Sequence, residues 1–523
     1  MLVRKSKVRS RFIFVACLII FGNSACGVFN SKLAPATAGS VPFVPVTATT
    51  IPFIPPELPG PITQPDANSS KVEPKIIDDY FQNPGIGWQA RSEAPSSLRL
   101  PESVAYAKRR DVAWSILNPA EDVYDWSALD KQMRDATAEG KQLSFRVYTM
   151  VGEDFNHHMV PNWVLEKGAV LLSTGEPDYS NCTYQEEWGN FIDELVKRYD
   201  GNQNIAFIDI SGYGNFNEWS WQDQQTEWDA AWEKGYLSGT VAPTLFETLD
   251  GQARRRLADM FIGGSFDKHQ CRLASGEITN ISYSYPGFQS SQLIMPFAGI
   301  VQSSQYVFSR RGDIGFRYDC LGRDSEYIRN KVGSIILKVW ETAPVVFEFC
   351  KPEQVDVNDA RLLLEYSHGS IVHDNTWQYG SNILKSLLKN TGYRYFLKNA
   401  TLRVAERTIT LQMDWQNLGT APSYPKMGQD FQLYFYLIDS TGAIVHKGLI
   451  PANVYQWLPS ESSGTSPQVY PVSYTENLPL SFPAGNYFAG VSIIDARTGK
   501  PINLAFGGLD PAGWHLLAPL EIK

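Results

Sequence analysis

Asn217 and Glu218 are the neighbouring residues in this sequence whose types and position best suit chemistry. They follow the apolar run 205–211 after a short turn that contains two glycines, as expected at the end of a buried strand. A carboxylic acid in this place can protonate a departing sugar oxygen, and a neighbouring amide can hold a sugar hydroxyl in the transition state. Trp219 adds an apolar ring that can stack on a sugar and raise the pKa of a carboxyl group. The alternative is an ordinary surface glutamate in a loop.

A second carboxylate is required for this chemistry, and two residues compete for the role. Glu348 lies at the tip of the apolar segment 344–349, and Asp319 follows the segment 314–318. A gap of about 5–5.5 Å to Glu218 would indicate a retaining mechanism with a nucleophile, and roughly 6.5–9.5 Å would indicate inversion. Alternatively, Glu348 is an ion-pair partner inside the barrel, and Asp319 binds substrate or pairs with Arg317.

Further polar and aromatic residues lie near the ends of other predicted strands. Arg146 can hold a nucleophilic carboxylate ionised and oriented, or it can form a purely structural ion pair. The segment around the eighth strand can line a sugar site or form a solvated loop, and its candidates are His368, Asn375 and Trp377. With 7 His in the chain and no ligand-like spacing, we expect neither a metal site nor a cofactor.

The elements that must position these residues are predicted by alternating apolar runs and amphipathic stretches between residues 76 and 396. Such alternation is typical of parallel βα units, and eight strands close a (β/α)8 barrel. Barrels of this kind carry their chemistry at the C-terminal ends of the strands. The predicted strands are 85–90, 112–117, 143–149, 205–211, 293–299, 314–318, 344–349 and 370–373.

After residue 396, apolar and polar residues alternate with a period of two. Ile409, Leu411 and Met413 alternate with polar residues, and similar runs with Gly-containing turns recur to the C-terminus. This indicates an antiparallel β-sandwich over 397–523. Its aromatic residues fall mostly at alternating core positions, which favours packing over sugar binding.

The N-terminal residues 1–26 have the features of a lipoprotein-type signal peptide. A basic stretch precedes an apolar run that ends at Asn23-Ser24-Ala25-Cys26. We expect lipidation at Cys26 and attachment to a bacterial cell envelope, with plain cleavage as the alternative. The Pro- and Thr-rich residues 27–75 are predicted to be a disordered linker. The net charge of -9 and the lack of a basic stripe argue against a nucleic-acid partner.

Four cysteines remain outside the signal segment, an even number that permits disulfides in an exported protein. Cys320 and Cys350 follow neighbouring predicted strands and are the favoured pair. The alternative is four buried free thiols.

Segment 114–121 together with Tyr124-Asp125-Trp126 resembles the second-strand region of clan A glycoside hydrolases, most closely the β-galactosidase type. Arg146 and Thr149, with Pro161-Asn162-Trp163-Val164, resemble the third strand and its loop. The resemblance spans most of residues 84–377. It implies that Asn217 and Glu218 are the acid/base pair, that Glu348 is the nucleophile, and that Trp114 and Trp163 line the sugar site.

A poorly characterised bacterial group that joins such a barrel to a C-terminal sandwich of unknown function is the nearest likeness. Asn83-Pro84-Gly85 and Gly87-Trp88 resemble its entry motif. The segments 317–322 and 264–292 depart from the clan A pattern.

Two main functions follow from these observations. The first is a cell-surface glycoside hydrolase that cleaves poly- or oligosaccharide with two carboxylates, by a retaining mechanism. The second is a non-catalytic glycan-binding or adhesion lipoprotein on a degenerate barrel, in which no carboxylate would face Glu218 within about 10 Å. An envelope protein without an open pocket is a third possibility.

Overall fold

The protein divides into two units, Met1–Thr50 and Ile51–Lys523. The structure, a computed structural model, describes only residues of the second unit, and the described residues are 55–66, 68–90, 100–152, 157–173, 175–220, 248–297, 301–319, 321–323, 333, 337, 339–349, 354–374, 380–460, 465–510 and 512–523. The predicted signal peptide and most of the predicted linker therefore lie outside the described residues.

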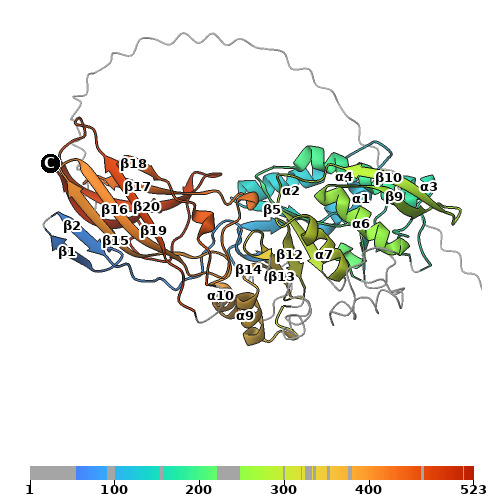
Figure 1. The fold of residues 1–523 in the computed structure, drawn as a ribbon, viewed down its shortest axis with the longest axis horizontal. Helices are drawn as coiled ribbons and strands as arrows, with labels where there is room; N and C mark the ends of the chain where they lie inside the picture. Colours follow the sequence, from blue (N-terminus) through green and yellow to red (C-terminus); the bar gives the residue numbers. More distant parts are fainter. Residues whose placement is uncertain are drawn as a thin grey trace, which may run out of the picture. The chain divides into compact units, whose positions relative to one another are not determined.

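Eight parallel strands form one sheet in the order β3-β14-β13-β12-β11-β8-β5-β4 (Figure 1). The strands follow one another around the sheet in chain order, from the first to the eighth. Among the described residues, the first strand and the second are not paired. The architecture is thus a nearly closed (β/α)8 barrel, as predicted. The strands are β3 (Gly87–Ala90), β4 (Val104–Tyr106), β5 (Gln142–Phe145), β8 (Ile205–Asp209), β11 (Leu293–Phe297), β12 (Gly315–Tyr318), β13 (Val345–Glu348) and β14 (Gly369–Asp374).

Burial on both faces explains why these short runs are almost entirely apolar. Every residue of β8, β11 and β13 is buried, which is typical of parallel strands covered by helices on one face and closed on the other. The few charged residues in or beside the strands therefore have to find partners inside the barrel.

Helices follow most of the strands and begin and end at recognisable signals. In α4, Asn181 accepts a hydrogen bond from the Tyr184 N–H at the N-terminus, and Gly140 has a left-handed φ of 75° just after α2. The helices are α1 (Trp114–Leu117), α2 (Ser127–Ala138), α3 (Asn162–Lys167), α4 (Cys182–Tyr199), α6 (Leu249–Ile262), α7 (Val301–Arg310), α9 (Val357–Tyr366) and α10 (Ser381–Leu388). Among the described residues, no helix is long and apolar enough to cross a membrane.

The predicted second strand, 112–117, is wrong. This segment forms the 3-10 turn Arg109–Val112 followed by α1, and the true second strand is β4, eight residues earlier. The apolar residues of 112–117 misled the prediction because their burial comes from packing of a short helix against α4. Only Ala113 makes a parallel bridge, to Tyr148.

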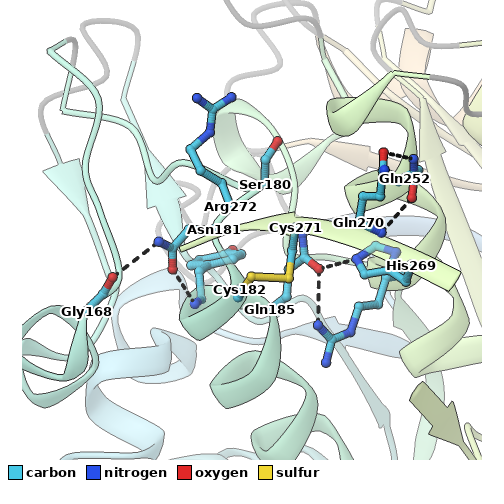
Figure 2. Close-up of a disulfide and its surroundings, with 12 residues drawn as sticks. Gly168, Ser180, Asn181, Cys182, Gln185, Gln252, His269, Gln270, Cys271 and Arg272 are labelled. Carbon is cyan, nitrogen blue, oxygen red and sulfur yellow. Dashed lines mark hydrogen bonds between the residues drawn. A yellow bond between two sulfur atoms is a disulfide. The ribbon is translucent and has the colours of Figure 1, made fainter. Parts of the chain in front are cut away.

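An antiparallel hairpin, β9 (Gly264–Arg272) with β10 (Ile278–Tyr285), is inserted between α6 and β11. It accounts for most of the irregular segment 264–292. A disulfide joins Cys271 on β9 to Cys182 at the start of α4, and Arg272 donates its backbone N–H to the Ser180 carbonyl (Figure 2). The prediction missed this pair and wrongly allowed four free thiols, because sequence does not show that the hairpin returns along α4. The favoured pair, Cys320 and Cys350, lies outside the described residues.

Removing this disulfide is expected to destabilise the protein. The bond closes a loop with a sequence separation of 89, so replacing Cys182 and Cys271 with Ser should lower the free energy of unfolding by about 2–4 kcal/mol. Thermal unfolding with and without a reducing agent measures the effect. Reductant should lower the melting temperature of the wild type and leave that of the double variant unchanged, and an equal response of both would contradict a structural disulfide.

The C-terminal part forms two antiparallel sheets, as predicted. One has the order β1-β2-β15-β16-β19, in which β1 is Ile62–Asp66 and β2 is Ser69–Val72, and the other has β18-β17-β20-β21 with β22 also paired to β20. The strands are β15 (Tyr395–Ala405), β16 (Thr408–Asn417), β17 (Phe431–Ile438), β18 (Ile444–Ile450), β19 (Tyr470–Asn477), β20 (Gly485–Asp495), β21 (Lys500–Pro501) and β22 (His515–Ile522). Their inward residues, such as Leu411, Leu433 and Val491, share one core.

The predicted linker, 27–75, ends too late. The strands β1 (Ile62–Asp66) and β2 (Ser69–Val72) form a hairpin that extends the first sheet of the sandwich. Figure 1 shows this hairpin beside β15. Val72 is fully buried in the sandwich core. The sequence hides these strands because they are short, mostly exposed, and paired with a strand more than 300 residues later.

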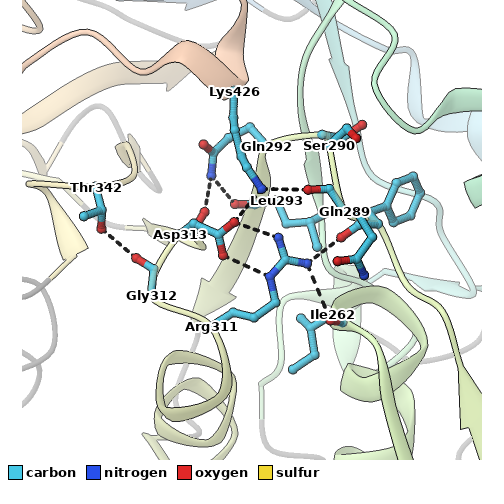
Figure 3. Close-up of polar contacts among 12 residues, drawn as sticks. Ile262, Gln289, Ser290, Gln292, Leu293, Arg311, Gly312, Asp313, Thr342 and Lys426 are labelled. Atoms are coloured by element: carbon cyan, nitrogen blue, oxygen red, sulfur yellow. Dashed lines mark hydrogen bonds and ion pairs between the residues drawn. The ribbon is translucent and has the colours of Figure 1, made fainter. Parts of the chain in front are cut away.

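Several polar contacts join the N-terminal end of the barrel to the segment before β17 (Figure 3). Lys426 pairs with Asp313 and donates to the Gln289 carbonyl, and Arg311 pairs with the same Asp313.

His368 lies at the N-terminal end of the barrel too, because it precedes β14. Its ring stacks on Trp340 at 3.6 Å, and its Nδ1 lies 2.7 Å from the Thr420 carbonyl oxygen.

Candidate active site

A fully buried aspartate, Asp209, organises the centre of the barrel. It ends β8, and its Oδ2 accepts hydrogen bonds from Arg146 Nε at 3.1 Å, from Arg317 Nη1 at 3.1 Å and from the Tyr106 hydroxyl at 3.0 Å. The two guanidinium groups are also almost completely buried. Buried charges of this kind are tolerated only when they are paired, so the aspartate fixes both arginines in place.

Each arginine extends past Asp209 to one of the two candidate catalytic glutamates. Arg146 Nη1 donates to Glu218 Oε1 at 2.8 Å, and Arg317 Nη2 donates to Glu348 Oε2 at 2.8 Å. The glutamate side chains remain 17% and 12% exposed, respectively. The site thus holds two carboxylates in fixed orientations while leaving both open to an incoming group.

The surrounding negative charges hold both arginines firmly in their protonated form. Burial would lower the pKa of Arg146, but the neighbouring carboxylates of Asp209 and Glu218 oppose this, and the pKa is raised. The pKa of Arg317 is raised in the same way against burial, by the carboxylates of Asp209 and Glu348. Burial and the nearby Asp209 raise the pKa of Tyr106, so its hydroxyl stays a donor.

Asp319 is the third carboxyl group of the site. One oxygen each from Glu218, Asp319 and Glu348 lie within 4.8 Å of one another. The three residues come from the ends of the fourth, sixth and seventh strands, as the strand count predicted. Glu348 and Asp319 therefore both lie beside Glu218.

A strained loop aims Glu218 into the cluster. The non-glycine residues Phe216, Asn217 and Trp219 have left-handed φ values of 51°, 55° and 56°. Such a conformation costs on the order of 1–3 kcal/mol per residue and persists only where surrounding contacts enforce it. Arg146 Nη1 provides one contact by donating to the Phe216 carbonyl at 2.9 Å. A run of left-handed residues around a carboxylate indicates that its direction matters.

The Asn217 side chain fastens this loop to Thr149, which follows the third strand, β5. Its Oδ1 accepts from the Thr149 backbone N–H at 2.7 Å, and its Nδ2 donates to the Thr149 hydroxyl at 2.8 Å. The residue is fully buried. The amide expected to hold a sugar hydroxyl is instead used to position Glu218.

Two of the tryptophans assigned to the sugar site from the sequence, Trp114 and Trp219, are fully buried in the core instead. Trp114 packs edge-on against Trp188 on α4, and Trp219 stacks on Tyr213 and donates to the Ile210 carbonyl. Trp163 on α3 is half-buried and donates to the Asn118 carbonyl. The sequence could not show which of these tryptophans line a sugar site, because aromatic rings fill a core as readily as they form a binding surface.

His368 was wrongly placed in the sugar site, because it lies at the N-terminal end of β14, opposite the ends that carry the carboxylates. His373, near the C-terminal end of that strand, pairs in register with Glu348 and packs on the Tyr106 ring at 4.6 Å. Asn375 and Trp377, together with Cys26, lie outside the described residues.

Sequence reasoning missed Asp209 and Tyr106. Asp209 carried a signal, since it is a charged residue inside an otherwise apolar strand while Arg146 and Arg317 occupy similar places. Three such charges in buried strands predict a mutual network. No such signal marked Tyr106, because the second strand was predicted at 112–117 and the segment that contains Tyr106 was not recognised as a strand.

Comparison with known proteins found no matching family model and no matching curated protein. Among solved structures, the chain is similar to a β-galactosidase from the psychrophilic Marinomonas ef1, with 12% identity and a TM-score of 0.35 over 58% of this chain and 59% of that one. The chain thus spans about three fifths of that protein. A psychrophilic glycoside hydrolase family 10 endo-β-1,4-xylanase matches with 9% identity and a TM-score of 0.27, covering 58% and 78% of the two chains.

A third similar structure is xylanase XynB from Paenibacillus barcinonensis, with 11% identity and a TM-score of 0.27 over 55% and 67% of the chains. These neighbours are distant, so the fold is assigned from the strand order of the barrel itself. The class of protein is a (β/α)8 barrel with a C-terminal β-sandwich. Within that class, its structural neighbours are glycoside hydrolases.

Proposed function

We propose that the protein is a retaining glycoside hydrolase that acts on poly- or oligosaccharides. The observation that carries this proposal is the approach of the Glu218 and Glu348 carboxylate oxygens to within 4.8 Å at the ends of the fourth and seventh strands. A separation of about 5–5.5 Å between carboxyl groups suits a nucleophile and an acid/base, whereas an inverting enzyme needs a wider gap for water.

In the proposed reaction, a Glu348 oxygen attacks the anomeric carbon while Glu218 gives a proton to the departing oxygen. Arg317 keeps the Glu348 carboxylate oriented for this attack. The glycosidic C–O bond breaks as the bond to Glu348 forms. Glu218 then removes a proton from water, and the resulting attack on the anomeric carbon releases the sugar and regenerates Glu348.

A non-catalytic sugar-binding role has less support. It predicts that no carboxylate faces Glu218, whereas two carboxyl groups do. It also draws on aromatic stacking surfaces, and both Trp114 and Trp219 are buried in the core. The arginines hold both glutamates in fixed orientations, as a nucleophile and an acid/base require.

A screen of purified protein against plant, bacterial and algal glycans tests the proposed function. We expect release of reducing sugar from at least one of them, and nuclear magnetic resonance of the first product should show the anomeric configuration of the substrate. An inverted first product would contradict the retaining mechanism. Binding without any hydrolysis would favour the adhesion role.

We also propose that Cys26 is lipidated and that the enzyme acts at a bacterial cell surface. The basic and apolar N-terminal sequence followed by Ser24-Ala25-Cys26 supports this location. The mass of the mature N-terminal peptide distinguishes a diacylated Cys26 from an unmodified one.

A further inference from the structure

Three carboxyl groups share the candidate active site, but they are not equally supported by positive charge. Glu218 and Glu348 each accept from an arginine at 2.8 Å. Among the described residues, Asp319 forms no ion pair, and its Oδ1 is buried without a hydrogen-bond partner. Asp319 therefore differs from both glutamates in its immediate contacts.

Within the part of the chain that the structure describes, four charged side chains act on Asp319. Glu218 and Glu348 are negative, and Arg317 and Arg146 are positive. The two arginines also have to balance Asp209, which both of them contact. Four ionised carboxylates would leave two uncompensated negative charges in a largely buried site. Carboxylates packed this closely do not all ionise, and they titrate as one coupled system.

Burial is the largest influence on Asp319, and it raises the pKa of this carboxyl well above its usual value. Repulsion by Glu218 and then by Glu348 acts in the same direction, and the attraction of Arg317 and Arg146 is too weak to reverse it. The geometry and the charge balance thus both indicate that Asp319 is the carboxyl group that keeps a proton.

We propose that Asp319 stores the proton of the resting site and passes it to Glu218 for use on the substrate. This inference rests on the proposed function and extends it to a residue that acts through Glu218. The oxygens of Asp319 and Glu218 lie within 4.8 Å, a gap that one water molecule bridges.

The proton balance of the proposed cycle is complete. When substrate binds, the Asp319 O–H gives its proton to Glu218, which gives it to the departing oxygen as the C–O bond breaks. In the second half, Glu218 takes a proton from the attacking water and returns it to Asp319. No oxidant, reductant or further reactant is needed.

Infrared difference spectroscopy tests where the proton resides, and it needs no substrate. In the wild-type minus Asp319→Asn spectrum at neutral pH, we expect the C=O band of a protonated carboxylic acid, shifted in deuterium oxide. The wild-type minus Glu218→Gln spectrum should lack this band. If the band is lost with Glu218 instead, or if no such band exists, the proposal is overturned even when the protein is an active glycosidase.

The pH dependence of hydrolysis tests whether the proton is used. In Asp319→Asn, Glu218 must keep its own proton beside Arg146, so the alkaline limb of kcat/KM should move to lower pH. We expect a loss of about 100-fold at neutral pH that shrinks under acidic conditions. Glu218→Gln should lose activity at every pH. An Asp319→Asn profile with an unshifted limb would overturn the proposal.

Asp259→Asn is a matched control, because Asp259 is also buried with a raised pKa caused mainly by burial, but it lies between Tyr283 and Tyr306 on the outside of the barrel. Its pH profile should match that of the wild type.

Asp319→Asn should fold normally, since it replaces a neutral acid with an amide of the same shape. A melting temperature equal to or above the wild-type value at pH 8 confirms that the variant is intact.

Discussion

Replacing Glu348 with Gln is expected to reduce hydrolysis on the order of 10⁵-fold, as removal of a covalent nucleophile does in other hydrolases. The amide keeps the shape of the side chain and can still accept from Arg317, which also retains its contact with Asp209. Folding should therefore be preserved. The loss should be equally large for natural glycans and for dinitrophenyl glycosides, because a good leaving group does not replace a nucleophile.

Two measurements separate this effect from a structural one. Azide or formate should restore turnover of the dinitrophenyl glycoside by Glu348→Gly and give a product of inverted configuration, because the truncated side chain leaves room for the small anion to attack in place of the missing carboxylate. Glu365→Gln on α9 is the matched control, since Glu365 forms a surface pair with Arg361. If Glu348→Gln keeps substantial activity, the nucleophile is another group and Asp319 is the next candidate.

Replacing Glu218 with Gln is expected to have a different signature. Cleavage of natural glycans should fall about 10²- to 10⁴-fold, the usual contribution of general acid–base catalysis. Dinitrophenyl glycosides need no proton on the leaving group, so the first step should persist with them. The glycosyl-enzyme then accumulates, because water lacks its base, and a burst of dinitrophenol should be seen.

Azide should relieve this block and give a product of retained configuration, since it needs no deprotonation. Glu194→Gln on α4, where Glu194 pairs with Lys197 at the surface, is the control with the same chemical change. Equal losses on natural and activated substrates, with no burst, would argue that Glu218 acts in binding or folding rather than as the acid/base.

The arrangement of the arginines explains why these two glutamates are expected to differ from ordinary buried ones. Both Arg146 and Arg317 are held by Asp209, so each glutamate meets a guanidinium that is already fixed. Preorganised charge of this kind needs no reorganisation during a reaction, which is where much of the catalytic effect of a site arises. Asp209 thus links the two glutamates through one buried centre.

Local patterns in the sequence predicted most of the fold. Seven of the eight barrel strands were predicted, because a buried parallel strand is a short apolar run whose identity is fixed by its own residues. The same counting placed Glu218, Asp319 and Glu348 at the ends of the fourth, sixth and seventh strands. The second strand failed because the apolar run at 112–117 belongs to a short helix, and the weaker run at 104–106 precedes it.

The sequence by itself therefore determined the type of barrel, the sandwich that follows it and the carboxyl groups that share one end of the barrel. Only the tertiary structure decided the partners of those groups. Asp209, Arg146 and Arg317 come from three different strands, and the strands β1 and β2 pair with β15 across more than 300 residues. Contacts between segments that are distant in the chain produce no periodic pattern in the sequence. The proposed proton on Asp319 depends on such contacts alone.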